Sequence, residues 1–333
     1  EFSLQTGLRS FSRKYDIPYM RHGSENIFHT VGFISGALNE EQHVGIALGM
    51  DNLIYDAEQA DYTLLQLNPY YTLENDNIRL RVGAHVDWQS ANGSGIKAAP
   101  DVKLDYTFAD TYVAYLHATG GTRLNDFRQQ NEESPYWGVI NQMRTSYTPA
   151  DLQVGFKASP LPGLGFHLFG GYRVTKDEIF HLPGITDTDF PYCYSLLMQE
   201  KAKVGYGGIK AAYGYKDIFD FSVGGTYYGW NVKDEAKVLL YLKPEFVLDA
   251  SARAKVYDEF WVSAAYRYEG RVKAGELEKA DAINNLSLSA GYEFFNSLNV
   301  FVRFNNLLNQ DYITEAGYPV QGFNAMAGVS FRF

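Results

Sequence analysis

The sequence predicts an all-β protein: a transmembrane, antiparallel, up-and-down β-barrel of about sixteen strands, within a range of roughly 14 to 18. Three observations support this fold class. Apolar and polar residues alternate with a period of two along most of the chain, short and long connections follow one another, and aromatic residues make up 16% of the composition. We expect residues 1–333 to form a single barrel domain with short periplasmic turns and long extracellular loops.

Apolar residues are abundant but dispersed. They make up 46% of the chain, yet the mean hydropathy is −0.27 and no run approaches the roughly 18 apolar residues of a transmembrane helix. The net charge of −10, without a basic cluster, argues against nucleic acid as a partner. The single cysteine, Cys193, excludes an internal disulfide framework and a cysteine-based metal site. A tyrosine-rich soluble β-protein, such as a lectin, is the alternative that composition leaves open.

The last strand, predicted at residues 323–333, has the length with which a tilted strand crosses a bilayer, roughly 9–11 residues. A single strand of this kind would also suit a soluble sandwich, so the prediction depends on repetition upstream. One face carries Phe323, Ala325, Ala327, Val329, Phe331 and Phe333, and the other carries Asn324, Met326, Gly328, Ser330 and Arg332.

The same alternation recurs upstream, for example in residues 78–88. In residues 236–256 the apolar positions keep one parity throughout. This predicts one long strand that projects beyond the membrane, with Pro244 as a break or a bulge, because proline cannot donate to a ladder. We expect residues 120–143 and 176–199 to be long irregular loops.

Connections of two kinds alternate along the chain. Tight turns on one side and extended loops on the other are typical of outer-membrane barrels, whereas sandwiches do not segregate loop lengths so regularly. The resulting count of about sixteen strands is even, as such barrels require. Short turns lie near positions 40, 75, 109, 161, 216, 258 and 296, and long loops near positions 18, 57, 94, 130, 187, 233, 276 and 314.

The polar faces of the predicted strands carry charges of both signs. Unpaired charges facing a second sheet would each cost several kcal/mol, whereas a water-filled lumen accommodates them. Arg253, Asp249, Glu269 and Arg267 can pair across neighbouring strands, which indicates a partly blocked interior. The candidate lumen or ligand residues are Arg79, Arg81, Asp87, Arg173, Asp249, Arg253, Arg267, Glu269 and Arg303.

The final third of the chain resembles the C-terminal barrel of TonB-dependent outer-membrane receptors. The resemblance rests on residues 305–312 (NNLLNQDY), residues 317–322 (GYPVQG) and the strand that ends in Phe333. It implies an outer-membrane location in a Gram-negative cell, with Phe331 and Phe333 recognised by the barrel-assembly machinery.

The resemblance also raises the question of energy coupling, because receptors of this family carry an N-terminal plug domain and contact an energy-coupling protein. Residues 1–75 do not resemble a plug. Either the protein is a smaller, plugless relative, or its amino-terminal portion lies outside this sequence. Residue 1 likewise opens without a leader, so any export signal has been removed or the chain begins partway into a longer protein.

No enzymatic or metal-binding motif is evident. The seven histidines are scattered without metal-ligand spacing, no Gly-x-Ser-x-Gly elbow occurs, and no Ser–His–Asp set can be assembled. We therefore expect no catalytic residue, no metal and no cofactor. The loop candidates are Trp137, Asp187, Asp189 and Tyr192. The two aspartates could hold Ca²⁺ or belong to a solvated acidic loop, and the aromatic residues could contact a ligand or pack the loops together.

The sequence thus favours a transport or receptor barrel that passes or binds a solute at the cell surface. A non-transporting barrel that anchors or assembles a protein complex through its long loops is the second hypothesis. An enzyme with a site at the rim is the third. The expected partners are outer-membrane lipid, the barrel-assembly machinery and either an energy-coupling protein or a surface protein.

Overall fold

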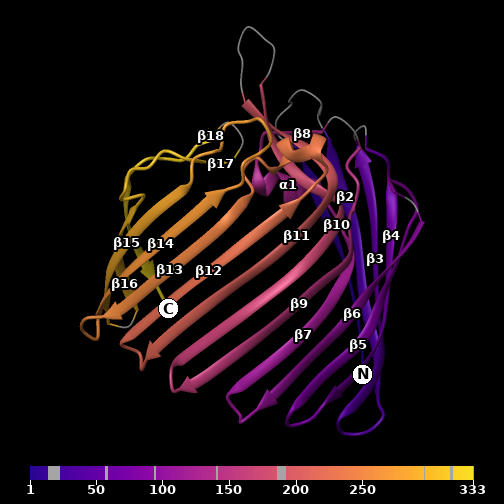
Figure 1. The fold of residues 1–333 in the computed structure, drawn as a ribbon, viewed down its shortest axis with the longest axis horizontal. Helices are drawn as coiled ribbons and strands as arrows, with labels where there is room; N and C mark the ends of the chain where they lie inside the picture. Colours follow the sequence, from indigo (N-terminus) through magenta and orange to yellow (C-terminus); the bar gives the residue numbers. More distant parts are fainter. Residues whose placement is uncertain are drawn as a thin grey trace.

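The computed structural model describes residues 1–13, 23–56, 59–93, 95–139, 142–185, 193–295, 297–315 and 318–332. Sixteen antiparallel strands follow one another in chain order and form one curved sheet, which the short strand β8 joins in parallel to β11 (Figure 1). The predicted all-β, up-and-down architecture is confirmed.

The long strands are β1 (Phe2–Ser12), β2 (Ser24–Ala37), β3 (Gln42–Asp56), β4 (Tyr62–Glu74), β5 (Ile78–Gln89), β6 (Gly95–Phe108), β7 (Tyr112–Arg123), β9 (Ser146–Leu161), β10 (Leu164–Ile185), β11 (Cys193–Tyr215), β12 (Phe219–Asn231), β13 (Pro244–Lys255), β14 (Phe260–Arg271), β15 (Ile283–Phe294), β16 (Leu298–Asn305) and β19 (Asn324–Phe331). The loops contain α1 (Phe127–Glu133), β8 (Trp137–Val139), the 3₁₀ helix η1 (Asp234–Leu240), β17 (Ile313–Glu315) and β18 (Tyr318–Pro319).

The two faces of the sheet differ as the alternation predicts. On β3, Leu48 and its even-numbered neighbours are exposed on the convex, outer face, whereas Asp51, Leu53 and Tyr55 are buried on the inner face. Because β3 pairs with β2 without a register shift, each residue's face is fixed across the ladder. The outer face therefore presents apolar side chains suited to lipid, and the inner face presents polar ones.

The last strand pairs with β16 along its whole length, with Phe301 opposite Gly328. A Cβ atom at position 328 would lie 2.5 Å from the Phe301 ring, so a side chain at this position would displace the ring. At the two ends of the sheet, β1 pairs with β2 and β19 pairs with β16. Among the described residues β1 and β19 do not pair with each other, so the described sheet has two edges.

The prediction of one long strand over residues 236–256 is wrong. Residues 234–240 form η1, Leu242 adopts a φ of 68°, and β13 begins at Pro244. The buried residues of η1 are Ala236, Leu239 and Leu240, which have helical spacing. The apolar residues at positions 236, 238, 240 and 242 have even numbers, as do most apolar residues of β13. This coincidence concealed the change from helical spacing to the alternation of a strand.

The two predicted irregular loops contain more regular structure than expected. Strands β10 and β11 continue as a hairpin far into residues 176–199, past a bulge at Asp177 whose φ of 54° interrupts the alternation. Within residues 120–143, β7 continues to Arg123 and is followed by α1 and β8. Helix α1 begins after Asp126, whose side chain accepts a hydrogen bond from the Gln129 backbone N–H (2.7 Å).

Two loop segments fold onto the loop end of the inner face. The α1–β8 segment (residues 124–139) places Phe127 and Trp137 against Leu53, Tyr55 and Tyr62. The η1 segment (residues 234–243) places Ala236, Leu239 and Leu240 against Phe180 and Ala202 of the β10–β11 hairpin. These two clusters partly fill the loop end of the interior with the protein's own side chains.

No helix among the described residues is long and apolar enough to cross a bilayer.

Because the two faces of the sheet differ, we expect arginine substitutions at adjacent residues of β3 to destabilise the protein by unequal amounts. Leu48→Arg places a charge in lipid, and we expect it to lower the free energy of unfolding by about 2–4 kcal/mol. Ala47→Arg faces the interior and should cost much less. Denaturant titration of the protein folded into phospholipid vesicles, followed by tryptophan fluorescence, measures both; equal losses would contradict the assignment of faces.

Candidate functional site

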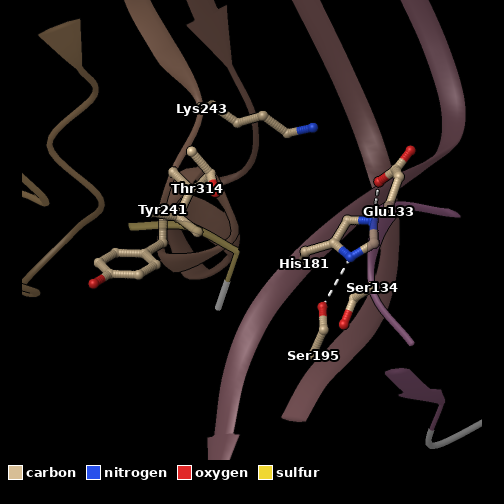
Figure 2. Close-up of a pocket in the computed structure, with 8 residues that line it drawn as sticks. Glu133, Ser134, His181, Ser195, Tyr241, Lys243 and Thr314 are labelled. Atoms are coloured by element: carbon tan, nitrogen blue, oxygen red, sulfur yellow. Dashed lines mark hydrogen bonds and ion pairs between the residues drawn. The ribbon is translucent and has the colours of Figure 1, made fainter. Parts of the chain in front are cut away.

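A cavity of about 170 Å³ opens at the loop end of the barrel, and we call it the mouth pocket. It lies where the end of α1, the β10–β11 hairpin, the end of the η1 segment and β17 meet. Figure 2 shows the acidic and hydroxyl residues on one side, and the lysine, tyrosine and threonine on the other. The lining residues are Glu133, Ser134, His181, Ser195, Tyr241, Leu242, Lys243 and Thr314.

The first wall of the mouth pocket is a hydrogen-bonded row centred on His181. Its Nδ1 lies 2.8 Å from the Ser195 Oγ, and its Nε2 lies 2.7 Å from the Glu133 Oε2 (Figure 2). The ring can therefore donate to the carboxylate while it accepts from the hydroxyl. The hydrogen bond from His181 holds the pKa of Glu133 below its ordinary value, so this carboxylate is ionised at neutral pH.

The backbone fixes this row in place. Ser195 N–H donates to the Tyr136 carbonyl (2.7 Å), and the parallel pairing of β8 with β11 sets Trp137 opposite Ser195. His181 is 48 positions from Glu133 and 14 positions from Ser195 in the chain, so their spacing in the sequence could not reveal this contact.

Glu133, His181 and Ser195 are the residue types of a hydrolase triad, but their geometry differs from one. The Ser195 side chain belongs to a residue with 0% exposure, so its hydroxyl is not presented to a substrate. The imidazole also meets the serine through Nδ1 and the carboxylate through Nε2, the reverse of the serine-protease arrangement. The row is a polar wall rather than an activated nucleophile.

Lys243 forms the opposite wall. Its Nζ lies 3.4 Å from the Ile179 carbonyl and above the rings of Phe180 and Trp230, at 5.0 and 5.5 Å from their centroids. Burial lowers the pKa of Lys243, and the negative charges of Glu178 and Glu133 oppose that shift. Both carboxylates have other partners, since Glu178 lies 3.8 Å from Arg123 and Glu133 bonds His181.

A row of ion pairs, which we call the charge ladder, connects this wall to the inner face of the sheet. Asp249 pairs with Arg267 (2.9 Å), Arg267 with Glu269 (2.7 Å), and Glu269 with Arg271 (2.6 Å). Arg271, only 3% exposed, then donates to the carbonyls of Leu242 and Ile313, the residues that precede Lys243 and Thr314. The charge ladder therefore positions two walls of the mouth pocket.

Three of the predicted lumen residues, Asp249, Arg267 and Glu269, thus lie together. Asp249 and Arg267 pair across β13 and β14, whereas Arg267 and Glu269 are on the same strand. Arg253 does not join them, because its guanidinium lies over the Trp261 ring, 4.6 Å from the centroid. Arg271 was not among the predicted lumen residues. Its position could have been predicted, because Arg267, Glu269 and Arg271 are each two residues apart and therefore share one face of a strand.

The other predicted lumen residues are spread around the inner face. Arg81 pairs with Asp101 (2.6 Å), and Asp87 accepts a hydrogen bond from the Thr122 backbone N–H (2.7 Å). Arg79 forms an exposed pair with Glu74 (2.8 Å) near the short turn.

The remaining two arginines have register neighbours on the inner face: Arg173 lies opposite Asp151, and Arg303 lies opposite Ser289. Together with the preceding pairs, they form a lining around the interior and not one site.

Of the predicted loop residues, Trp137 is fully buried against Phe127, with the Arg13 guanidinium 4.5 Å from its ring centroid. In this position it packs the loops together. Asp187, Asp189 and Tyr192 lie outside the described residues, as does Phe333, while Phe331 is exposed on the outer face. Within the described ranges, no group of three His, Cys, Asp or Glu side chains could hold a metal.

Comparison with known proteins gives matches in fold alone. No protein-family model and no curated protein sequence matches the chain. The siderophore receptor PirA from Acinetobacter baumannii matches with a TM-score of 0.70 at 11% identity, over 96% of this chain and 56% of that one. The FrpB iron transporter from Neisseria meningitidis (F3-3 variant) matches with a TM-score of 0.68 at 13% identity, over 94% and 56%. The copper transporter OprC matches with a TM-score of 0.64 at 12% identity, over 99% and 65%.

These structures are TonB-dependent outer-membrane receptors, so the resemblance predicted from residues 305–312 and 317–322 is confirmed for the fold. The chain has the fold of an outer-membrane receptor barrel. It spans 56% to 65% of the length of the three structures.

The polar row predicts a pH-dependent anchor for the α1–β8 segment. Because the pKa of Glu133 is lowered in the folded protein, its stabilising contribution is present above about pH 4.3 and lost as the pH falls through the lowered value. Glu133→Gln should destabilise the segment by about 1 kcal/mol at pH 7, with roughly fivefold faster amide exchange across residues 127–139.

Hydrogen exchange followed by mass spectrometry measures this effect. Glu132→Gln is the matched control, because Glu132 pairs with the exposed Arg128 (3.0 Å) on the same helix and does not line the mouth pocket. Faster exchange in both variants, or in neither, would show that the Glu133–His181 contact does not hold the segment.

Proposed function

We propose that this protein is an outer-membrane transport or receptor barrel that binds a solute in the mouth pocket and passes it along the inner face. One observation carries the proposal: a cavity lined by ionised and hydroxyl side chains lies at the loop end of the interior, between two segments folded in from the loops. Concave sites with a few convergent polar groups are the usual form of solute sites.

The fold supports the same function class. The structures that it matches are named as transporters of copper and of iron and as a siderophore receptor. Those cargoes belong to those proteins. The polar lining of the mouth pocket supports an organic solute that hydrogen-bonds to the pocket walls as the proposed cargo of this chain.

The charge ladder links the proposed site to the interior. A solute held between Lys243 and Thr314 would touch two stretches whose preceding carbonyls both accept hydrogen bonds from Arg271. Movement of either stretch would disturb the Arg271–Glu269 pair (2.6 Å) and the rest of the ladder on β13 and β14. Occupancy of the mouth pocket is thereby coupled to the wall below it.

A non-transporting barrel that anchors a surface protein complex is the second candidate. The observation that favours it is the β10–β11 hairpin, whose strands are the longest of the sheet and extend beyond their neighbours (Figure 1). One of the matching structures, FpvAI, is a complex with the protein pyocin S2. In either function we propose outer-membrane lipid and the barrel-assembly machinery, acting on Phe331 and Phe333, as partners. The third proposed partner is an energy-coupling protein for the transport function or a surface protein for the anchoring function.

Filling the mouth pocket tests the transport proposal. Thr314→Trp places a large side chain in the cavity without removing a charge. Binding of a panel of small organic solutes to the purified chain in detergent is measured by isothermal titration calorimetry. We expect at least one solute to bind the wild-type protein and to lose at least tenfold in affinity in this variant.

The control is Leu308→Trp, which adds the same side chain at an exposed loop position outside the pocket lining. Binding that survives Thr314→Trp would place the solute elsewhere. A panel in which no solute binds would favour the anchoring function.

A further inference from the structure

The mouth pocket has two poles of opposite charge. Lys243 stands on one side, next to Thr314, and Glu133 stands on the other, on the same side as Ser134 (Figure 2). We propose that the mouth pocket binds a small zwitterion of the α-amino acid class, with its carboxylate on Lys243 and its ammonium on Glu133. This inference rests on the proposed solute-binding function and specifies its ligand.

Lys243 is suited to receive a carboxylate because most of its hydrogen-bonding capacity is unused. An ammonium group has three N–H donors. Among the described residues, the Lys243 ammonium makes one hydrogen bond, to the Ile179 carbonyl, and this bond is long at 3.4 Å. The Phe180 and Trp230 rings stabilise the positive charge but supply no lone pair acceptor. A ligand carboxylate would provide the strong charge-assisted hydrogen bond that the protein does not.

The position of Lys243 is fixed from both sides, so the ammonium is held ready for a ligand. Trp230 Nε1 donates to the Pro244 carbonyl (2.8 Å), which orients the ring beneath the ammonium. On the other side, Arg271 holds the Leu242 carbonyl. The residues immediately before and after Lys243 are therefore both restrained by hydrogen bonds.

Glu133 is suited to receive an ammonium group. His181 engages its Oε2, and a carboxylate can accept about four hydrogen bonds in all. The carboxylate remains half exposed toward the pocket, unlike the fully buried Ser195 beside it. Because His181 keeps this carboxylate ionised, it offers a full negative charge to a cationic group.

Charge balance and size select a zwitterion over a simple ion. Lys243 and Glu133 cancel, so a bare anion at Lys243 would also meet the charge of Glu133, and a bare cation at Glu133 would meet that of Lys243. A ligand carrying both charges complements both poles. The cavity of about 170 Å³ is large enough for an amino acid with a short side chain.

The experiment compares three probes of similar size on the full chain in detergent by isothermal titration calorimetry. L-Alanine carries both charged groups, lactate replaces the ammonium by a hydroxyl, and ethylamine lacks the carboxylate. We expect L-alanine to bind at least tenfold more tightly than either analogue, because each analogue leaves one charged pole without its partner.

Variants then assign the poles. Lys243→Met and Glu133→Gln should each weaken L-alanine binding at least tenfold. Lys237→Met is the matched control, since it removes a lysine from the neighbouring 3₁₀ helix where Lys237 pairs with Asp234 (2.8 Å) outside the pocket lining. Circular dichroism of each variant confirms that the barrel is folded, and Lys243→Arg, which retains the charge, should keep most of the affinity.

The proposal is overturned if lactate or ethylamine binds as tightly as L-alanine, if L-alanine does not bind, or if its binding is unchanged in the folded Lys243→Met and Glu133→Gln variants. These outcomes are distinguishable from failure of the proposed function. A different solute that binds the wild-type protein and is lost in Thr314→Trp would leave the mouth pocket as a solute site while refuting the zwitterion. Absence of binding by every solute would refute both.

Discussion

The structure depends on one constraint: within a bilayer, the backbone N–H and C=O groups of a strand must find partners inside the protein. The meander of sixteen antiparallel strands meets this need for every strand between the two edges of the described sheet, because each of them pairs with the strands before and after it in sequence. The period-two alternation follows from the same constraint, because a pleated wall between lipid and water exposes successive side chains to different surroundings. Outer-face Leu48 and inner-face Asp51, both on β3, show the contrast.

Above the membrane this constraint no longer applies, and the chain uses other means. The α1–β8 and η1 segments bury aromatic and aliphatic side chains against the loop end of the inner face. The contacts of Glu133 and Arg271 then join these segments to the hairpin and to the charge ladder. The mouth pocket exists because these two segments meet over the interior without filling it, and its polarity comes from residues that also hold the segments in place.

The sequence predicted what depends on local periodicity. The faces of the strands, their approximate number and the pairing of Asp249, Arg267 and Glu269 could all be derived from parity, because a strand fixes which side chains share a surface. The parts that it did not predict depend on contacts between distant segments. His181 meets Glu133 only because the β10–β11 hairpin packs against the end of α1, and no local pattern encodes that meeting. Residues 236–243 show the reverse case. Their apolar residues alternate as in a strand, although the segment forms a short 3₁₀ helix and a turn.

The measurement that tests the central claim most directly is a residue-by-residue accessibility scan of β3. Single cysteines at positions 46 to 50, in a Cys193→Ser background, carry spin labels in protein folded into lipid vesicles, and collisions with oxygen and with a water-soluble nickel complex are measured. A two-faced wall predicts that even positions collide with oxygen in lipid and odd positions with nickel in water, with a strict period of two. Equal access to the nickel complex at all positions, or a period near 3.6, would contradict the account.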